Sequence, residues 1–361
     1  MNPKLSSAVS VVKISDTILE FFKSNTRQQV RLKVINDDIL DLVLKLDGSR
    51  SIEQISREDD IDEESLRSLI CYLSDKGVLD NTDPIEDFED YQKFRRPIHF
   101  LNDYSSSHAQ LVGFWDKLRS ANIVIIGLGA VGSWVACSLA ESGVNHFILF
   151  DPDNVDVSNL HRQYGYTEQD IGRLKADALS DRLLSYNDKI EVKKITKYLD
   201  GDALNCLNDE KIDLIINCAD KPSVDQTSLW IGEYSMKRNI PHIVGGGYNL
   251  HLSLIGQTVI PGKTACVMCF QKQLEEENKI DPSRVKKLMI RNRKVGSFGP
   301  MCAIIANFVG MEAIKVLTGC TFPANANRRG EFDIYTMDIK YNVYKRVSDC
   351  KWCGENGKYH Y

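Results

Sequence analysis

The feature that most constrains this chain is an alternation of short apolar runs with helical segments, which begins at about residue 105. Each run has the length of one strand, and in order they are ANIVIIG (121–127), HFILFD (146–151), IEVKKI (190–195), DLIINCAD (213–220) and PHIVGG (241–246). Strands that alternate with helices predict a mainly parallel sheet with helices on both faces. Residues 105–361 are therefore expected to form one large α/β domain.

A glycine-rich loop follows the first run. Gly127, Gly129 and Gly132 form GLGAVG between the strand IVII and the helical segment AVGSWVACSLAESG. This placement is typical of the nucleotide-binding turn of Rossmann-like folds, because glycines let backbone N–H groups approach a phosphate at a helix N-terminus. Asp151 ends the next run, 19 residues after Gly132, where a carboxylate can accept a ribose hydroxyl. The alternative is a tight turn without a ligand, and spacing alone favours NAD as the nucleotide.

The segment after Asp151 favours a triphosphate over NAD. It holds Asn159, Arg162, Gln163 and Lys175. A hydride-transfer site does not need this density of phosphate-seeking side chains. Arg and Lys that converge on a loop suit a triphosphate whose α-phosphorus is attacked and whose pyrophosphate leaves. The alternative interpretation is a solvated basic helix face, which is what most helical Lys and Arg residues form.

Two segments of this region resemble a known family. DPDNVDVSNLHRQ (151–163) and GRLK (172–175) are similar to the ATP site of the ThiF/MoeB/HesA superfamily, the ubiquitin-activating-enzyme-like adenylating enzymes. The resemblance covers roughly residues 105–353 and implies ATP and Mg²⁺ as cofactors. The implied nucleotide contacts are Asp151 on the ribose and Asn159, Arg162 and Lys175 on the phosphates, with Gln163 as a further nucleotide-binding residue.

The same resemblance implies two further active-site residues. Asp220, in NCADKP, matches the aspartate that the family associates with Mg²⁺. In that family an upstream arginine reaches the ATP site of the partner subunit, so a homodimer is expected. KFRRP places this role on Arg96, or alternatively on Arg95, although the glutamine that usually follows the arginine is Pro97 here. The expected catalytic residues are Arg96, Arg162, Lys175 and Asp220.

Four cysteines predict a metal site. CVMC (266–269) and CKWC (350–353) are two C-x-x-C pairs, and two such pairs can bind one Zn²⁺ tetrahedrally. The expected ligands are Cys266, Cys269, Cys350 and Cys353. A closed four-cysteine site leaves no open coordination position, so the zinc is expected to be structural. A redox C-x-x-C is the alternative, and it does not explain the second pair.

Composition limits the location and the partners of the protein. The net charge is −5, which does not suggest nucleic-acid binding. No uninterrupted apolar run is long enough to cross a bilayer, and the first residues, MNPKLSSAVSVVKIS, lack the apolar core of a signal peptide. We therefore expect a cytoplasmic protein with no membrane and no nucleic-acid partner, in a compartment where structural disulfides are rare.

Residues 1–82 are expected to form a small winged-helix-like domain, joined to the core by a linker at 83–104. TILEFF and QVRLKV predict a hairpin, three short helical patterns follow, and VLDN predicts a final strand. Fused to an adenylating core, this unit resembles the leader-peptide-recognition domain of enzymes that modify ribosomally made peptides. The exposed strand QVRLKV can accept a peptide as an added strand. A DNA-binding winged helix, disfavoured by acids on the third helix, and a structural cap are the alternatives.

An acyl-accepting cysteine is expected to be missing. Many relatives carry one on the crossover after the first C-x-x-C, but this chain has none between Phe270 and Met301. Cys302 follows at the start of a predicted helix and is interpreted as a packing residue. The second half of the crossover (271–299) is basic and can close over an acidic substrate, or it is a solvated surface helix.

We therefore predict an ATP- and Mg²⁺-dependent enzyme that adenylates a carboxylate of a precursor peptide with an acidic core. Capture of the acyl-adenylate by a nearby nucleophile would give a cyclised or amidated peptide, as in antibiotic maturation enzymes of the PaaA or MccB kind. The first alternative is activation of the C-terminal glycine of a ubiquitin-like sulfur carrier, of the thiamine or molybdopterin type. The second alternative is a non-catalytic nucleotide-binding scaffold.

Overall fold

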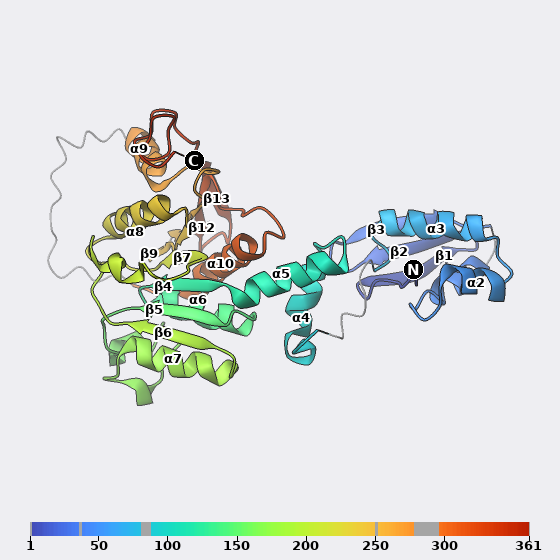
Figure 1. The fold of residues 1–361 in the computed structure, drawn as a ribbon, viewed down its shortest axis with the longest axis horizontal. Helices are drawn as coiled ribbons and strands as arrows, with labels where there is room; N and C mark the ends of the chain where they lie inside the picture. Colours follow the sequence, from blue (N-terminus) through green and yellow to red (C-terminus); the bar gives the residue numbers. More distant parts are fainter. Residues whose placement is uncertain (1, 36–37, 81–87, 250–251, 278–295, 361) are drawn as a thin grey trace. The chain divides into compact units, whose positions relative to one another are not determined.

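The computed structural model (Figure 1) describes residues 2–35, 38–80, 88–249, 252–277 and 296–360. The chain divides into two compact units, residues 1–111 and 112–361. This boundary lies beyond the expected domain end at residue 82 and beyond the expected linker, so the first unit contains more of the chain than the sequence indicated.

The first unit begins with a three-stranded antiparallel sheet in the order β1-β2-β3. The strands are β1 (Val9–Ser15), β2 (Ile18–Lys23) and β3 (Gln28–Lys33). β2 and β3 form the predicted hairpin. β1 was not predicted, although its Val9 and Val11 pack against the apolar core. The predicted final strand VLDN is reduced, within the described residues, to a single bridge between Leu79 and Leu5.

Three helices complete this fold, as predicted. They are α1 (Asp38–Leu44), α2 (Ile52–Glu58) and α3 (Glu63–Asp75). Ser51 caps α2: its hydroxyl accepts from the Gln54 N–H while the Gln54 side chain accepts from the Ser51 N–H, a reciprocal pair that satisfies two end groups of the helix. On α3, Leu66, Ile70 and Leu73 form the buried face. The sheet and the helices thus share one apolar core.

The end of the first unit is helical. The helices are α4 (Tyr91–Asn102) and α5 (His108–Ser120), and α5 runs across the boundary between the units. The expected linker 83–104 therefore contains regular structure, while its beginning lies outside the described residues. The backbone leaves helical geometry at Phe94, so Pro97 falls in the first turn of the segment that follows, where proline is tolerated. Phe94 and Ile98 are buried one turn apart, a helical spacing that the linker interpretation missed.

The second unit contains a six-stranded sheet in the order β11-β8-β7-β4-β5-β6. In chain order the strands are β4 (Asn122–Ile126), β5 (His146–Phe150), β6 (Glu191–Ile195), β7 (Leu214–Asn217), β8 (His242–Val244) and β11 (Thr258–Val259). The five predicted runs are confirmed as strands that pair in parallel, and β11 adds an antiparallel edge. β4 lies between β5 and β7, so the strand order reverses there. Ligands bind at such a reversal in open α/β sheets.

Helices cover both faces of this sheet (Figure 1). They are α6 (Ala130–Glu141), α7 (Lys175–Tyr186), α8 (Val224–Arg238) and α10 (Gly299–Thr318), while α9 (Val267–Glu277) packs against α8. Val124 and Ile126 of β4 belong to the same buried cluster as Ile231 of α8. Because side chains alternate along a strand, the other face of β4 packs against α6, which also contacts α7 and α10. The predicted Rossmann-like architecture is confirmed.

A second, antiparallel sheet in the order β13-β12-β10-β9 was not predicted. Its strands are β9 (Gly247–Asn249), β10 (Leu252–Ile255), β12 (Arg328–Asp333) and β13 (Ile339–Val343). Within the described part of the chain, β10 joins two segments about eighty residues apart, since it pairs with β9 on one side and with β12 on the other. α10 packs against this sheet as well as against α6.

α10 is the only helix among the described residues that is long and apolar enough to cross a membrane. It behaves as a core helix, because it packs against α6 and its Glu312 is buried. The Glu312 carboxylate accepts from the Thr258 hydroxyl at 3.0 Å and pairs with Lys315 at 2.9 Å, so two charges interrupt the apolar run. The bond to Thr258 fastens α10 to β11.

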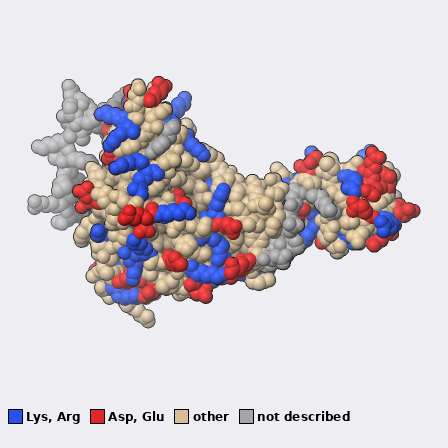
Figure 2. Space-filling view, viewed as in Figure 1, with Lys and Arg blue, Asp and Glu red and all other residues tan. Residues whose placement is uncertain are grey.

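The charged side chains are mixed in sign. On the face drawn in Figure 2, Lys and Arg alternate with Asp and Glu over the larger unit. Nucleic-acid sites usually gather basic residues on one face. This face shows no such gathering among the drawn side chains.

Candidate active site and metal centre

A cavity of about 950 Å³ lies at the carboxyl ends of β4, β5 and β7, where the strand order reverses. Most of the predicted site residues line it, and they are Gly127, Gly129, Asp151, Asn159, Arg162, Gln163, Lys175 and Asp220. Gly132 does not line the cavity. Arg95 and Arg96 are exposed on α4 and belong to the other compact unit. The structure therefore brings the predicted nucleotide residues together from four separate stretches of sequence.

The glycine loop is shaped by close backbone contacts. Gly127 has a φ of +87°, and a Cβ there would lie 2.6 Å from the backbone nitrogen of Ala219. A Cβ on Gly132 would lie 1.9 Å from the carbonyl oxygen of Gly127, so Gly132 is required for packing of the loop against α6. Gly129 is the N-cap of α6 and has no side chain to cap it, so the first N–H groups of the helix can face an anion.

Asp151 joins the glycine loop to the end of β5. Its side chain is buried; Oδ2 accepts from the Leu128 N–H at 2.6 Å, and Oδ1 accepts from the Asp153 N–H at 2.8 Å. Burial raises the pKa of this carboxyl, and the charge of Lys175 and the two N–H donors act in the opposite direction. The Tyr166 hydroxyl donates to the Leu128 carbonyl at 2.7 Å and holds the loop from the other side. Each Asp151 oxygen keeps a lone pair that can accept a ribose hydroxyl.

Lys175 and Lys221 approach the same carboxylate. Lys175 is the first residue of α7, is 6% exposed, and lies with its Nζ 3.2 Å from Oδ2 of Asp153. The Nζ of Lys221 lies 3.6 Å from that same oxygen, but the Lys221 side chain is 74% exposed. A buried lysine needs a compensating anion, so Asp153 stabilises the predicted phosphate-binding residue in the absence of a ligand.

A short turn positions Asn159 and Arg162. The 3₁₀ helix η2 (Val157–Asn159) is capped by Asp156, and the Asn159 Oδ1 accepts from the Asp156 N–H at 3.0 Å. Arg162 donates from Nη1 to the Ser158 carbonyl at 2.8 Å. A guanidinium has five N–H donors, so this anchoring bond leaves others for a phosphate.

Gln163 is buried beside the glycine loop. It is 4% exposed, and its Nε2 would lie 3.9 Å from a Cβ on Gly129. Its Oε1 has no hydrogen-bond partner within the described ranges. A buried polar atom without a partner is unfavourable, so this amide fits a site that is completed by a ligand.

Asp220 follows β7 and is exposed at the edge of the cavity. Asn217 holds the turn before it, because its Oδ1 accepts from the Ala219 N–H at 3.1 Å and its Nδ2 donates to Thr227 at 3.2 Å. An exposed carboxylate beside the phosphate-directed residues is the kind of oxygen ligand that Mg²⁺ prefers.

The sequence analysis missed several cavity residues: Asp153, Lys197, Tyr198, Asn217 and Lys221. Each stands at or just after the carboxyl end of a strand, which is where a doubly wound sheet collects its ligand contacts. That rule, applied to every strand rather than to the glycine loop alone, would have found them.

The thiols near the cavity are poor nucleophiles. Cys302 is fully buried in the first turn of α10, and its burial raises its pKa. Cys218 lines the cavity, and burial raises its pKa to about 12. The thiolate is the reactive form, so neither side chain is poised for attack at neutral pH. These observations support the interpretation of Cys302 as a packing residue. The basic half of the crossover lies outside the described residues.

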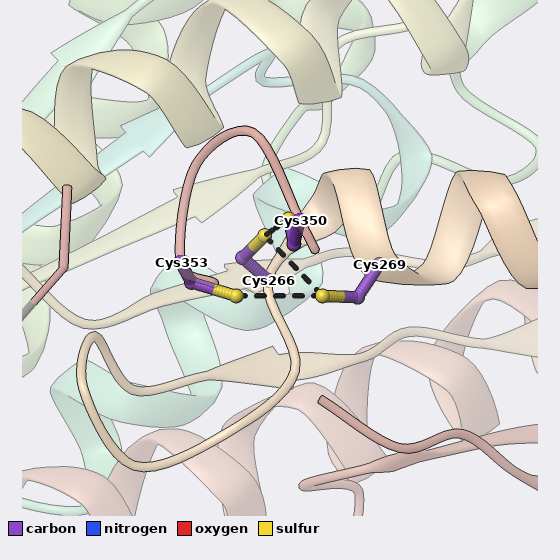
Figure 3. Close-up of side chains that lie close together, drawn as sticks. All are labelled: Cys266, Cys269, Cys350 and Cys353. Carbon is purple, nitrogen blue, oxygen red and sulfur yellow. Dashed lines mark hydrogen bonds between the residues drawn. The ribbon is translucent and has the colours of Figure 1, made fainter. Parts of the chain in front are cut away.

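The four predicted metal ligands converge (Figure 3). All are buried, and their sulfur atoms lie within 4.8 Å of one another: Cys266, Cys269, Cys350 and Cys353. The Sγ–Sγ distances are 3.8 Å for Cys266–Cys269, 3.6 Å for Cys266–Cys350 and 3.4 Å for Cys269–Cys353. A tetrahedral Zn²⁺ with Zn–S bonds of about 2.3 Å needs neighbouring sulfurs roughly 3.8 Å apart. The residues therefore fit a structural zinc ion.

Neighbouring groups support this cluster. The Val347 N–H donates to the Cys269 Sγ at 3.4 Å. Arg346 donates to the Cys353 carbonyl from Nε at 2.9 Å and to the Gly262 carbonyl from Nη1 at 2.7 Å. Such outer contacts orient the ligands of a metal site. α9, which carries Cys269, is thereby tied to the C-terminal segment.

Comparison with known proteins identifies relatives of both parts of the chain. Residues 106–352 match the ThiF family model. The sulfur carrier protein ThiS adenylyltransferase of Escherichia coli K12 is 29% identical over 265 residues, which cover 73% of this chain and 96% of the relative. The expected extent of the resemblance, roughly residues 105–353, is confirmed.

Solved structures match nearly the whole chain. E. coli MccB with AMPCPP and MccA has a TM-score of 0.78 and 24% identity, covering 98% of this chain and 100% of MccB. PaaA has a TM-score of 0.72 and 19% identity, covering 95% of this chain and 100% of PaaA. Both coverages include the first unit, so the small N-terminal fold and the large core occur together in these proteins as well.

Proposed function

Because the chain belongs to the ThiF family, we propose that it adenylates a carboxylate on a ribosomally made precursor peptide. ATP-dependent adenylation itself is the activity of the family, and the curated relatives are adenylyltransferases, which removes the alternative of a non-catalytic scaffold. The observation that carries the finer proposal is the combination, in one chain, of this core with an N-terminal unit like that of MccB, which was solved with MccA.

The cavity residues have distinct roles in this proposal. Asp151 accepts hydrogen bonds from the ribose, and the glycine loop places backbone N–H groups of α6 against the phosphates. Around the phosphates lie Asn159, Arg162, Gln163 and Lys175. A substrate carboxylate oxygen attacks the α-phosphorus, an O–P bond forms, and the bond to pyrophosphate breaks. Arg162 and Lys175 stabilise the charge that develops on the phosphate oxygens and on the departing pyrophosphate.

Asp220 is proposed to hold Mg²⁺ at the edge of the cavity. When bound, Mg²⁺ neutralises phosphate charge and orients the triphosphate for displacement. Asp220 contributes an exposed carboxylate, held in place by the Asn217 turn. Zn²⁺ is proposed only as a structural ion at the four-cysteine cluster.

The acyl-adenylate is proposed to react directly with a nucleophile of the substrate. Such capture forms a new acyl bond, breaks the acyl–phosphate bond and releases AMP. The raised pKa values of Cys218 and Cys302 support a route without a protein thioester. The product is then a cyclised or amidated peptide.

The N-terminal unit is proposed to bind the leader half of the peptide. β3 pairs with β2 on one side and is the last strand of its sheet, so its other edge presents backbone groups. An extended peptide can add to such an edge by main-chain hydrogen bonds. Exposed side chains alternate with half-buried ones along β3, as they do on a strand with one solvated face.

The sulfur-carrier alternative has its own support, since the ThiS adenylyltransferase of E. coli shares 29% of the aligned residues. Both candidate reactions use the same core residues and differ in the substrate. ATP–pyrophosphate exchange separates them: we expect exchange with an acidic peptide encoded beside this gene, and not with a folded ubiquitin-like carrier ending in Gly-Gly. The reverse result would establish the carrier reaction.

We also propose a cytoplasmic homodimer in which Arg96 of each chain completes the ATP site of its partner. Arg96 is exposed on α4, as a residue that acts across an interface must be in the isolated chain. The mixed surface charge is consistent with a peptide partner rather than with nucleic acid.

A further inference from the structure

Lys221 is a cation that neither the fold nor the assigned site explains. Its side chain is 74% exposed, and its one described ion pair, with Asp153, has a separation of 3.6 Å. An exposed ion pair of this kind contributes little to stability. Yet Lys221 lines the cavity and directly follows Asp220. Its position therefore points to a ligand rather than to packing.

The surroundings of Lys221 identify the ligand. Its Nζ and the Nζ of Lys175 both approach Oδ2 of Asp153, at 3.6 and 3.2 Å. Two ammonium groups this close repel each other, and one carboxylate compensates only one of them. Because both Nζ atoms lie beside the same carboxylate oxygen, a phosphate bound near the buried Lys175 can also contact the exposed Lys221.

The balance of charge favours a polyanion. The described residues around the cavity include four permanent cations, against three carboxylates. The cations are Arg162, Lys175, Lys197 and Lys221, and the carboxylates are Asp151, Asp153 and Asp220. Asp220 is proposed to hold Mg²⁺, and Asp151 is engaged by backbone N–H groups. The remaining positive charge suits a chain of phosphates, and it concentrates where Lys175 and Lys221 meet.

We propose that Lys221 is a second triphosphate-binding lysine, which leaves Asp153 when ATP binds and contacts the β- or γ-phosphate beside Lys175. The inference rests on the proposed ATP site and adds a residue to it. Lys175 is buried and fixed, so it marks the phosphate position, whereas Lys221 supplies a mobile charge at the cavity edge. Lys221 thereby holds the pyrophosphate part of ATP and has no contact with AMP.

The test is titration of the full-length protein with Mg·AMPCPP and, separately, with AMP, in the absence of peptide. The variants are Lys221→Met, Lys221→Arg and a matched control, Lys193→Met. Lys193 is an exposed lysine on β6 that pairs with Glu210 and does not line the cavity. The control therefore removes one positive charge from the same unit without touching the site.

We expect Lys221→Met to weaken AMPCPP binding about tenfold, the effect of one charge-assisted hydrogen bond. AMP binding should be unchanged, Lys221→Arg should recover most of the affinity for AMPCPP, and Lys193→Met should match the wild type. Unchanged AMPCPP affinity in Lys221→Met, or an equal loss for AMPCPP and AMP, would overturn the inference. Failure of the wild type to bind AMPCPP would instead refute the proposed ATP site itself.

Discussion

Both units of this protein pair charged side chains at the surface, and the second unit also buries opposite charges around a cavity. In the first unit, charged side chains pair on the surface: Lys45 lies 2.6 Å from Asp59, and Arg50 lies 3.0 Å from Glu58. In the second unit, Asp151 and Lys175 are buried around a cavity. Exposed pairs contribute about 0–1 kcal/mol, whereas burying a charge is unfavourable and is retained where a ligand site uses it. The contrast places the chemistry in the second unit.

The units also differ in which polar groups lack a hydrogen-bond partner among the described residues. The first unit has an apolar core and presents strand edges, which suit recognition of an extended chain. The second presents an unpaired Gln163 oxygen, an uncapped helix start and a polar cavity, which suit a nucleotide. Under the proposed function, the first unit binds peptide backbone and the second binds and cleaves ATP.

The largest expected difference between the units concerns zinc. The variant Cys266→Ser, Cys269→Ser should lose the single zinc ion and unfold the second unit at ordinary temperature, because structural zinc sites contribute on the order of 10 kcal/mol in zinc-finger peptides. All four tryptophans, Trp115, Trp134, Trp230 and Trp352, belong to the second unit, so tryptophan fluorescence follows that unit alone. Metal analysis and thermal unfolding check the prediction.

Cys71→Ser is the matched control for the zinc prediction, because Cys71 is an exposed cysteine on α3 of the first unit. It should retain one zinc ion and the wild-type unfolding temperature. A native protein without zinc, or a double variant with full zinc content, would contradict the metal assignment.

The next effect is on catalysis. Asp220→Ala and Lys175→Ala should keep both units folded and reduce substrate-dependent ATP–pyrophosphate exchange by about 10²–10³-fold, the usual effect of removing one transition-state charge contact. Asp209→Ala removes an exposed carboxylate that does not line the cavity and serves as the control. Full exchange in the Asp220 and Lys175 variants would show that the site has been assigned to the wrong residues.

Mild acid should weaken the second unit through His242. Burial lowers the pKa of His242 from 6.5 to about 4. As the pH falls, the His242 ring is protonated in the unfolded chain before it is protonated in the folded chain. The free energy of unfolding that is present at pH 7 is therefore lost as the pH falls through 6.5 toward 4. The loss should reach about 2 kcal/mol between pH 7 and pH 5. In the first unit burial raises the pKa of Asp80, so protonating that group in acid does not weaken the unit.

His242→Leu should abolish much of this acid sensitivity, because both ring nitrogens lack partners among the described residues and an apolar side chain suits the position. Urea unfolding followed by tryptophan fluorescence at pH 7 and pH 5 measures the difference. Equal pH dependence in the variant and the wild type would exclude His242 as the cause.

The smallest expected effect is a partial recovery of activity in mixed dimers, in which the first unit of one chain completes the active site of the other. If Arg96 acts in the partner's site, mixing inactive Arg96→Ala with inactive Asp220→Ala should restore activity, since one site of each mixed dimer has both residues. Equal mixing gives roughly a quarter of the wild-type sites. Exchange activity after verified subunit mixing measures it. Arg95→Ala in place of Arg96→Ala tests which arginine acts, and no recovery with either would count against the trans arginine.

The core was predictable from the sequence because its constraints are local. Gly127 and Gly132 are required by close backbone contacts, and a parallel strand buried on both faces is recognisable as a short apolar run. The cysteine site was predictable for the same reason, because the two cysteines of each pair are three residues apart in the sequence. Only the approach of the two pairs to each other depends on the fold.

The missed parts depend on contacts that are distant in sequence. β10 pairs with β12, about eighty residues away, and RRGEFD in β12 is too charged to indicate a strand by itself. Lys221 and Lys175 are separated by 46 residues in the chain and meet only at Asp153. α4 was missed for a different reason, since an acidic stretch followed by the basic KFRRP indicated a linker although the buried residues of α4 have helical spacing.

The division of labour between the units is tested most directly by deleting residues 1–82 and measuring ATP–pyrophosphate exchange with the precursor peptide. The account predicts that ATP affinity stays within about twofold of the full-length value, because every assigned nucleotide residue except Arg96 lies in the second unit. The KM for the peptide should rise by about 10²-fold or more, the gain that a tethered binding module provides. Unchanged turnover and KM after the deletion would contradict the account and favour the carrier-protein reaction.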